Sequence, residues 1–143
     1  MKTIINRFKL ISKHEIDVIN ITDNVIKTTH DSSISSGLAL IMSLHTTTGI
    51  FVNEGEPDVE ADIKNQFEML APENFSYRHA RFLATDGQMA INSVSHIKSA
   101  LMGFQCFFPI EYNALVKGSR QNIYFVDFDG PQERNYVIQI LGN

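Results

Sequence analysis

The sequence predicts an α+β fold: one domain over residues 1–143, with a mixed, mainly antiparallel sheet core and two to three helices. Runs with strand-like patterns outnumber helical runs and are not strictly interleaved with them, which disfavours a doubly wound parallel sheet. The composition, 43% hydrophobic and 20% charged, is typical of a globular protein of 143 residues that buries a core without disulfides. No repeat and no Pro-rich or Ser-rich linker divides the chain.

Seven segments have the pattern of strands. They are residues 4–10, 16–21, 38–44, 50–52, 104–110, 121–128 and 136–141. The segment 38–44 is apolar at both odd and even positions, which predicts a central strand covered on both faces. The last segment follows turn chemistry at Asp129-Gly130-Pro131, so we expect it to form a hairpin with the strand before the turn.

Three helices are expected between the strands. Thr22 is predicted to cap a short one with Val25 and Ile26 on its apolar side. A longer helix opens at residues 56–57, carries apolar residues at 59, 63, 67 and 70, and stops at residue 72. Ser93 is predicted to cap a third helix that Gly103 closes. The segment 73–90 has no period and is predicted to be a long loop, a kind of segment that is often functional.

Composition also excludes several classes of function. Twelve basic and sixteen acidic residues give a net charge of −4, which argues against a nucleic-acid partner held by phosphate contacts. The single Cys106 is expected to be a small buried hydrophobe rather than a nucleophile. The N-terminus lacks the pattern of a signal peptide, and the longest apolar run is far shorter than the roughly 20 residues of a membrane span. We therefore expect a soluble cytoplasmic protein without a membrane partner.

Three of the five histidines occupy positions that can face a cleft: His45 ends a strand, His79 lies in the long loop and His96 lies in the first turn of the third helix. The helix N-terminus disfavours the charged form of His96, and the neutral imidazole is the form that binds metal. Three imidazoles with one open position are the ligands of catalytic zinc. Their spacing matches no local metal motif, so unrelated structural histidines remain the alternative. His14 and His30 are expected to be exposed.

Acids and polar groups beside strand ends complete the candidate site. Glu54 directly follows a strand, where it could act as a general acid or base. Asp62 borders the apolar stripe of the second helix, so we expect it to be partly buried and to orient a histidine ring, with a structural ion pair as the alternative. The candidates for holding a phosphate or carboxylate are Thr46, Thr47, Asn53, Ser119, Arg120 and Gln121. No serine-hydrolase elbow, phosphate-binding loop or dinucleotide motif is present.

An ordered set of residues extends over most of the chain after Gly37. It comprises His45-Thr46-Thr47, Asn53-Glu54, Asp58, Asp62, Pro72, Tyr77, His79, Asn92, His96, Leu101, Gly103, Pro109, Gly118, Gln121 and Asp129-Gly130-Pro131. In this order, these residues resemble the small bacterial and archaeal YjbQ family. The ordered set is much more specific than any of its pieces.

The resemblance implies an α+β fold that assembles as a homotrimer, with a site near the subunit boundary. It also implies a metal held by His45, His79 and His96. Members are described as secondary thiamine-phosphate synthases, which join a pyrimidine diphosphate to a thiazole phosphate and release pyrophosphate, an activity thought to be weak. Imidazole ligands favour zinc, and magnesium could arrive with a phosphorylated substrate.

The expectation is therefore a metal-dependent enzyme acting on a small phosphorylated or otherwise anionic molecule. Two alternatives stay open: a non-catalytic trimeric metal-binding or scaffold protein, and a metal-dependent hydrolase of another small anionic substrate. Three residues depart from the family pattern. Val94 stands where many members have a second histidine, Arg120 stands in place of a tryptophan, and Asp127 stands in place of a glutamate.

Overall fold

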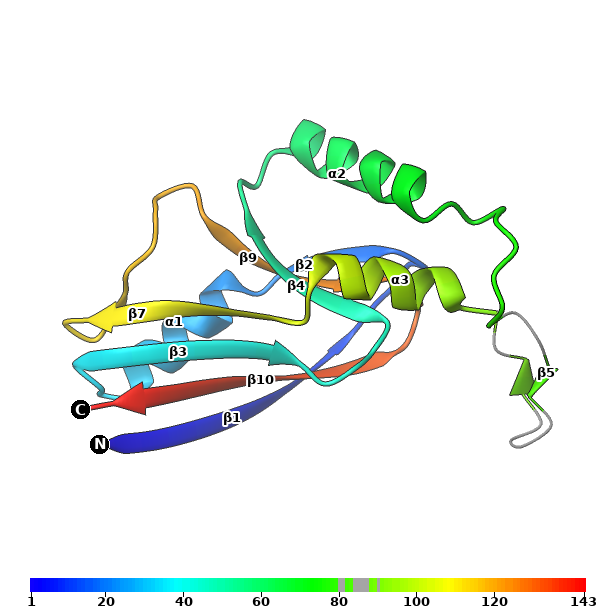
Figure 1. Cartoon of the computed structure of the whole chain (residues 1–143). Helices are drawn as coiled ribbons and strands as arrows, with labels where there is room; N and C mark the ends of the chain where they lie inside the picture. The colour runs from blue at the N-terminus through cyan, green and yellow to red at the C-terminus, as the bar shows by residue number, and fades with distance from the viewer. Residues whose placement is uncertain (80–81, 84–87, 90) are drawn as a thin grey trace.

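Two antiparallel sheets face each other in the computed structural model, which describes residues 1–79, 82–83, 88–89 and 91–143 (Figure 1). The larger sheet has the order β1 (Lys2–Ile11), β10 (Glu133–Gly142), β3 (Ser36–Ser43), β7 (Gln105–Glu111) and β8 (Ala114–Leu115). The smaller sheet has the order β2 (Asp17–Asn20), β9 (Asn122–Asp127) and β4 (Thr48–Asn53). Together with three helices, these sheets confirm the predicted α+β class.

The core lies between the two sheets. Alternate residues of β3, β7 and β10 point inward from the larger sheet, and β4 and β9 supply the opposing side chains. Helix α1 (Thr22–Asp31) adds Val25, which is fully buried. Side chains alternate across a strand, so the inward residues of each strand share one face. In β3, which is apolar at both odd and even positions, only the structure shows which face is the inner one.

The outer face of the larger sheet is not covered by any described part of the chain. Leu38, Leu40 and Met42 of β3 are only partly buried, and they alternate with fully or nearly fully buried residues. Leu40 pairs in register with Phe107 of β7, whose side chain is 65% exposed. The strand predicted to be covered on both faces is therefore central in its sheet but covered on one face only within a single copy of the chain.

Two helices lie on the other side of the smaller sheet. Helix α3 (Ser93–Met102) runs alongside β4, and α2 (Pro57–Leu70) stands farther out in Figure 1. No residue of α2 is fully buried, so the apolar residues predicted along one side of this helix are only partly shielded from water. Among the described helices, none is both long and apolar enough to cross a membrane.

Both predicted serine and threonine caps are wrong. Thr22 and Ser93 are the first helical residues, and neither Ile21 nor Asn92, which hold the cap positions, makes a side-chain cap. The Thr22 hydroxyl instead accepts the Ile123 backbone N–H at 2.8 Å, which ties α1 to β9. The predicted end of α3 is confirmed, since Gly103 has a φ of 88°, a conformation that favours glycine.

Two predictions about connections are also wrong. The last strand does not form a hairpin with β9; β10 pairs with β1 and β3, so residues 129–131 carry the chain from one sheet to the other. The segment 73–90 is not a plain loop, because β5 (Phe82–Leu83) and β6 (Gln88–Met89) pair within it. Its residues 80–81, 84–87 and 90 lie outside the described part of the chain.

Candidate functional site

An open pocket of about 570 Å³ lies between the loop that joins β3 to β4 and the helix α3. This volume is in the range of small-molecule sites. Two of the predicted metal-binding histidines, His45 and His96, line it. The lining residues are Ser43, Leu44, His45, Thr46, His96, Ser99, Ala100, Gly103 and Phe104.

The rings of His79 and His96 lie next to each other. Their centroids are 5.4 Å apart and the ring planes are almost perpendicular, at 75°. Two imidazoles on one tetrahedral zinc, with Zn–N bonds of about 2.0–2.1 Å, place their centroids roughly 5 Å apart. The spacing of this pair therefore fits a shared metal ion, although the two residues are far apart in the sequence.

The third predicted ligand is engaged elsewhere. Nε2 of His45 accepts a hydrogen bond from the backbone N–H of Asn135 at 2.8 Å. Among the described residues, no three His, Cys, Asp or Glu side chains are grouped so that they could hold a metal ion. The described residues thus offer a pair of imidazoles suited to a metal, with His45 in the same pocket but bonded to the sheet.

The charge state of His45 follows from its surroundings. Partial burial, and secondarily the positive charge of Arg134, lower the pKa of His45 below its usual value, and the nearby Asp127 carboxylate offsets this only in part. His45 is therefore neutral at pH 7. The predicted exposure of His14 and His30 is confirmed.

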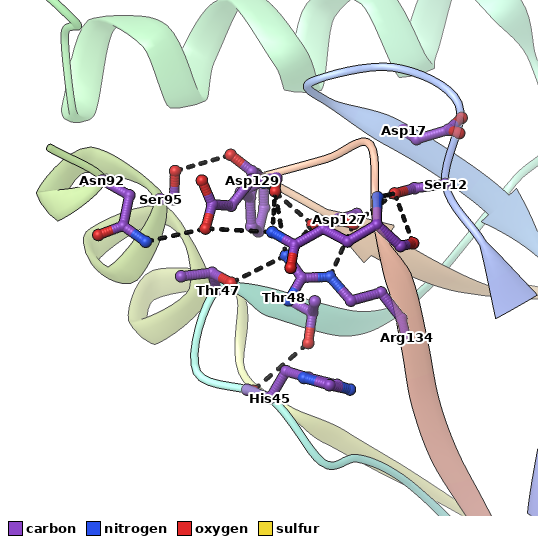
Figure 2. Close-up of polar contacts among 12 residues, drawn as sticks. Ser12, Asp17, His45, Thr47, Thr48, Asn92, Ser95, Asp127, Asp129 and Arg134 are labelled. Carbon is purple, nitrogen blue, oxygen red and sulfur yellow. Dashed lines mark hydrogen bonds and ion pairs between the residues drawn. The ribbon is translucent and has the colours of Figure 1, made fainter. Parts of the chain in front are cut away.

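A buried ion pair holds the loops around the pocket (Figure 2). Asp127 is fully buried, and it accepts hydrogen bonds from Nε and Nη2 of Arg134 at 2.8 and 2.6 Å. Ser12 Oγ donates to the same carboxylate at 2.6 Å, as does the backbone N–H of Asp129 at 3.0 Å. Burial raises the pKa of Asp127, but these hydrogen bonds and the charge of Arg134 outweigh it and hold the pKa below its usual value.

The Asp127–Arg134 network also binds the loop between β3 and β4, which lines the pocket. Nη2 of Arg134 donates to Thr47 Oγ1 at 3.0 Å, and the Phe128 N–H donates to the Thr47 carbonyl at 3.0 Å. The Thr47 side chain is buried, so its hydroxyl serves the network rather than the pocket. Of the two threonines predicted to bind substrate, Thr46 is exposed and lines the pocket.

Helix α3 is fastened by polar groups on its buried face. Ser95 Oγ donates to the Phe128 carbonyl at 2.7 Å, and Ser99 Oγ donates to the Thr48 carbonyl at 2.6 Å. At the start of the helix, the Asn92 side chain donates to the Asp129 carboxylate at 2.8 Å (Figure 2). Because these bonds join α3 to the β9–β10 connection and to β4, they fix the position of His96 relative to the pocket.

The remaining predicted site residues form a second group. Glu54 pairs with Arg120, while Asn53 Oδ1 accepts the Glu54 N–H at 2.8 Å. Gln121 Oε1 accepts the Gly118 N–H at 2.7 Å. These residues, with Ser119, lie at or just after the far end of β4 or just before β9, whereas the pocket lies before β4 begins. Six strand residues span roughly 20 Å, so one copy of the chain does not bring both groups to one small substrate.

Two other expectations have clear outcomes. Asp62 is exposed on α2, so the prediction of partial burial is wrong, and no described contact joins it to a histidine.

Cys106 lies half-buried in β7, and burial raises the pKa of its thiol to about 12, which fits the predicted apolar role better than a nucleophile.

Our sequence reasoning missed the Asp127–Arg134 pair. A signal for Arg134 was available, because it shares the even-numbered face of its strand with Tyr136, Ile138 and Ile140, which point into the core. A charged residue on the buried face of a strand requires a partner. Nothing in the sequence identified the backbone N–H of Asn135 as a partner for His45.

Comparisons with known proteins match this chain to one family over nearly its whole length. Residues 6–143 match a family described as UPF0047 protein YjbQ-like. The UPF0047 protein YugU of Bacillus subtilis is 35% identical over 127 residues, covering 88% of this chain and 90% of that protein. A UPF0047 protein of Methanocaldococcus jannaschii is 32% identical, covering 94% and 96%.

Solved structures agree as well. A YbjQ-like protein of Sulfolobus solfataricus P2 has a TM-score of 0.90 at 29% identity and covers 99% of both chains. A protein of the same family from Clostridium acetobutylicum has a TM-score of 0.84 at 35% identity, covering 95% of this chain and 99% of that one.

Proposed function

This chain belongs to the UPF0047 YjbQ-like family, and we propose that it is a metal-dependent enzyme acting on a small phosphorylated or otherwise anionic molecule. The observation that carries the proposal is the pairing of His79 and His96 beside a pocket of ligand size. Zinc suits imidazole ligands, and magnesium bound to a diphosphate could enter with the substrate. A divalent ion at this pair would stabilise negative charge on phosphate oxygens.

The hydrogen-bond donors of the pocket support an anionic substrate. Thr46 offers an exposed hydroxyl, and ring N–H groups of His45 and His96 can donate hydrogen bonds to phosphate oxygens. Within this class, the finer proposal is transfer of a pyrimidine group from its diphosphate to a thiazole phosphate, with release of pyrophosphate. The physiological substrate can differ while the site chemistry stays the same.

We propose further that the active assembly is a homotrimer with a shared site. The uncovered apolar face of the larger sheet supports association, because leaving side chains such as Phe107 and Leu40 in water is unfavourable. The position of the two groups at opposite ends of β4, a strand of roughly 20 Å, supports sharing, since Glu54 could then serve as general acid or base for the pocket of another copy.

Turnover assays on purified protein test the activity. Metal content is measured first, then release of phosphate or pyrophosphate from a panel of phosphate esters and diphosphates, with lactones and amides as further substrates. We expect turnover to disappear in a His96→Ala protein whose circular dichroism is unchanged. A metal-binding wild type that turns over no substrate, with a melting temperature raised by metal, would favour the scaffold alternative.

Mixing inactive variants tests whether the site is shared. His96→Ala and Glu54→Gln are each expected to be inactive alone. If one copy supplies His96 and another supplies Glu54, random mixing restores about a quarter of the sites. Recovery of no activity after co-refolding into a stable trimer would show that both residues act within one copy, and a Glu54→Gln protein that is active alone would show that Glu54 has no catalytic part.

A further inference from the structure

The ring of His45 is held in one tautomer by the backbone. Asn135 N–H donates to Nε2 at 2.8 Å, and a nitrogen that accepts an N–H carries no proton of its own. In the neutral ring the proton must then be on Nδ1. No described residue accepts a hydrogen bond from Nδ1.

The bond to Asn135 replaces a missing strand partner. Strand β3 ends at Ser43, which pairs with Tyr136, and the next N–H along β10 has lost its acceptor on that side. The Leu44 N–H still bonds to the Asn135 carbonyl at 3.1 Å, and the His45 ring accepts the Asn135 N–H. Breaking this bond would leave a partly buried N–H without a partner, which is unfavourable.

This arrangement conflicts with metal binding by His45. A metal at Nε2 would displace the Asn135 N–H, and a metal at Nδ1 would require the single ring proton to be lost or to move to Nε2, where it would face the Asn135 N–H. Among the described hydrogen bonds, none engages a ring nitrogen of His79 or His96, and the centroids of these two rings are spaced as in two ligands of one ion.

Other donors in the pocket are mostly committed to the protein. Ser43 Oγ is bonded to Thr48 Oγ1 and also accepts the His45 backbone N–H at 3.3 Å. Ser99 Oγ donates to the Thr48 carbonyl. Among the described hydrogen bonds, the Nδ1–H of His45, the hydroxyl of Thr46 and a ring N–H of His96 remain free to donate to a ligand.

We propose that His45 is not a metal ligand but the hydrogen-bond donor that holds an oxyanion, of the phosphate class, in this pocket. The Asn135 N–H is the group that keeps the proton on Nδ1, and thus keeps His45 a donor. The assignment rests on the proposed function in one respect, which is that the anion is part of the substrate. The position of the ring proton on His45 does not depend on the proposed function.

The tautomer can be measured directly. In the metal-free full-length protein labelled with ¹⁵N-histidine, long-range ¹H–¹⁵N correlation spectra distinguish a protonated ring nitrogen from a bare one. We expect His45 to carry its proton on Nδ1, both before and after zinc is added, while zinc shifts the ring nitrogens of His79 and His96. A proton on Nε2, or a zinc-induced change at a His45 nitrogen like that at His96, would overturn the proposal.

Two substitutions separate donor from ligand. His45→Asn retains an N–H near the position of Nδ1 but cannot replace an imidazole on a metal, whereas His45→Ala removes both functions. With inorganic phosphate as the probe, we expect His45→Ala to weaken binding roughly 10-fold or more and His45→Asn to stay close to wild type. Both should retain the zinc content of wild type, and His96→Ala should lose it.

The outcomes distinguish this proposal from the one above. Loss of zinc in both His45 variants, or unchanged phosphate affinity in His45→Ala, would overturn the donor role and leave the metal-dependent enzyme standing. Phosphate binding that depends on His45 in a protein that takes up no zinc would support the donor role and remove the metal from the proposed function. If His45→Ala does not fold, His45→Asn and the wild-type spectra still decide.

Discussion

Replacing Asp127 by asparagine should destabilise the protein strongly. The substitution keeps the shape of the side chain and removes its charge. Each carboxylate oxygen accepts two hydrogen bonds: Oδ1 from Arg134 Nη2 and the Asp129 N–H, and Oδ2 from Arg134 Nε and Ser12 Oγ. Whichever oxygen becomes the amide NH₂ group then faces two donors.

The size of the effect follows from burial. Asp127 is fully buried and Arg134 is 4% exposed, so water cannot solvate the guanidinium that is left without its carboxylate partner. Removing one partner of a buried ion pair costs about 3–5 kcal/mol of unfolding free energy. Two lost hydrogen bonds to a charged group, at about 1.5–3 kcal/mol each, give a similar figure.

Urea unfolding at pH 7 and fixed protein concentration measures this cost. The matched control is Glu133→Gln, which breaks an ion pair with Lys9 on the neighbouring strand at a similar N–O distance of 2.8 Å. Because both partners of that pair are mostly exposed, the control should lose less than about 1 kcal/mol. Equal losses in the two variants would refute the argument that burial makes the Asp127 pair important.

The pH dependence of unfolding provides a second readout. Asp127 has a lower pKa in the folded protein than the usual 3.8, so its charged form stabilises the fold. That contribution is complete above the unfolded-state pKa and is lost as the pH falls through it toward the folded-state value. Between neutral pH and about pH 3, the stability difference between wild type and Asp127→Asn should therefore shrink.

Three further outcomes are expected. His96→Ala should lower zinc affinity far more than His14→Ala, since His14 is exposed and outside the pocket; equal zinc content would remove His96 from the metal site. Lys98→Met should speed amide exchange in α2 about tenfold, because buried Lys98 bonds the half-exposed carboxylates of Glu68, within that helix, and Glu73, just after it, while exposed Lys64→Met should not. Asp62→Asn should leave zinc affinity unchanged, and a 10–100-fold loss would show that it supports a ligand after all.

The sequence by itself determined the fold class and most of the strands. Alternation of apolar and polar residues depends only on the two-residue period of a strand, so β1 could be located without knowing its neighbours, and β3, β7 and β9 could be located as short, mostly apolar runs. The end of α3 at Gly103 could also be predicted, because the backbone conformation there favours glycine. The ordered residues from His45 to Pro131 were sufficient to indicate the family.

Tertiary structure decided what the candidate residues do. Thr47 and His45 were expected in the pocket by their position at a strand end, but Arg134 and the Asn135 N–H, from the other end of the chain, engage them. Glu54 proved to be at the opposite end of β4, which no local pattern could show. Hydrogen-bond partners depend on how strands from distant parts of the chain are juxtaposed, and residue spacing along the chain does not encode that distance.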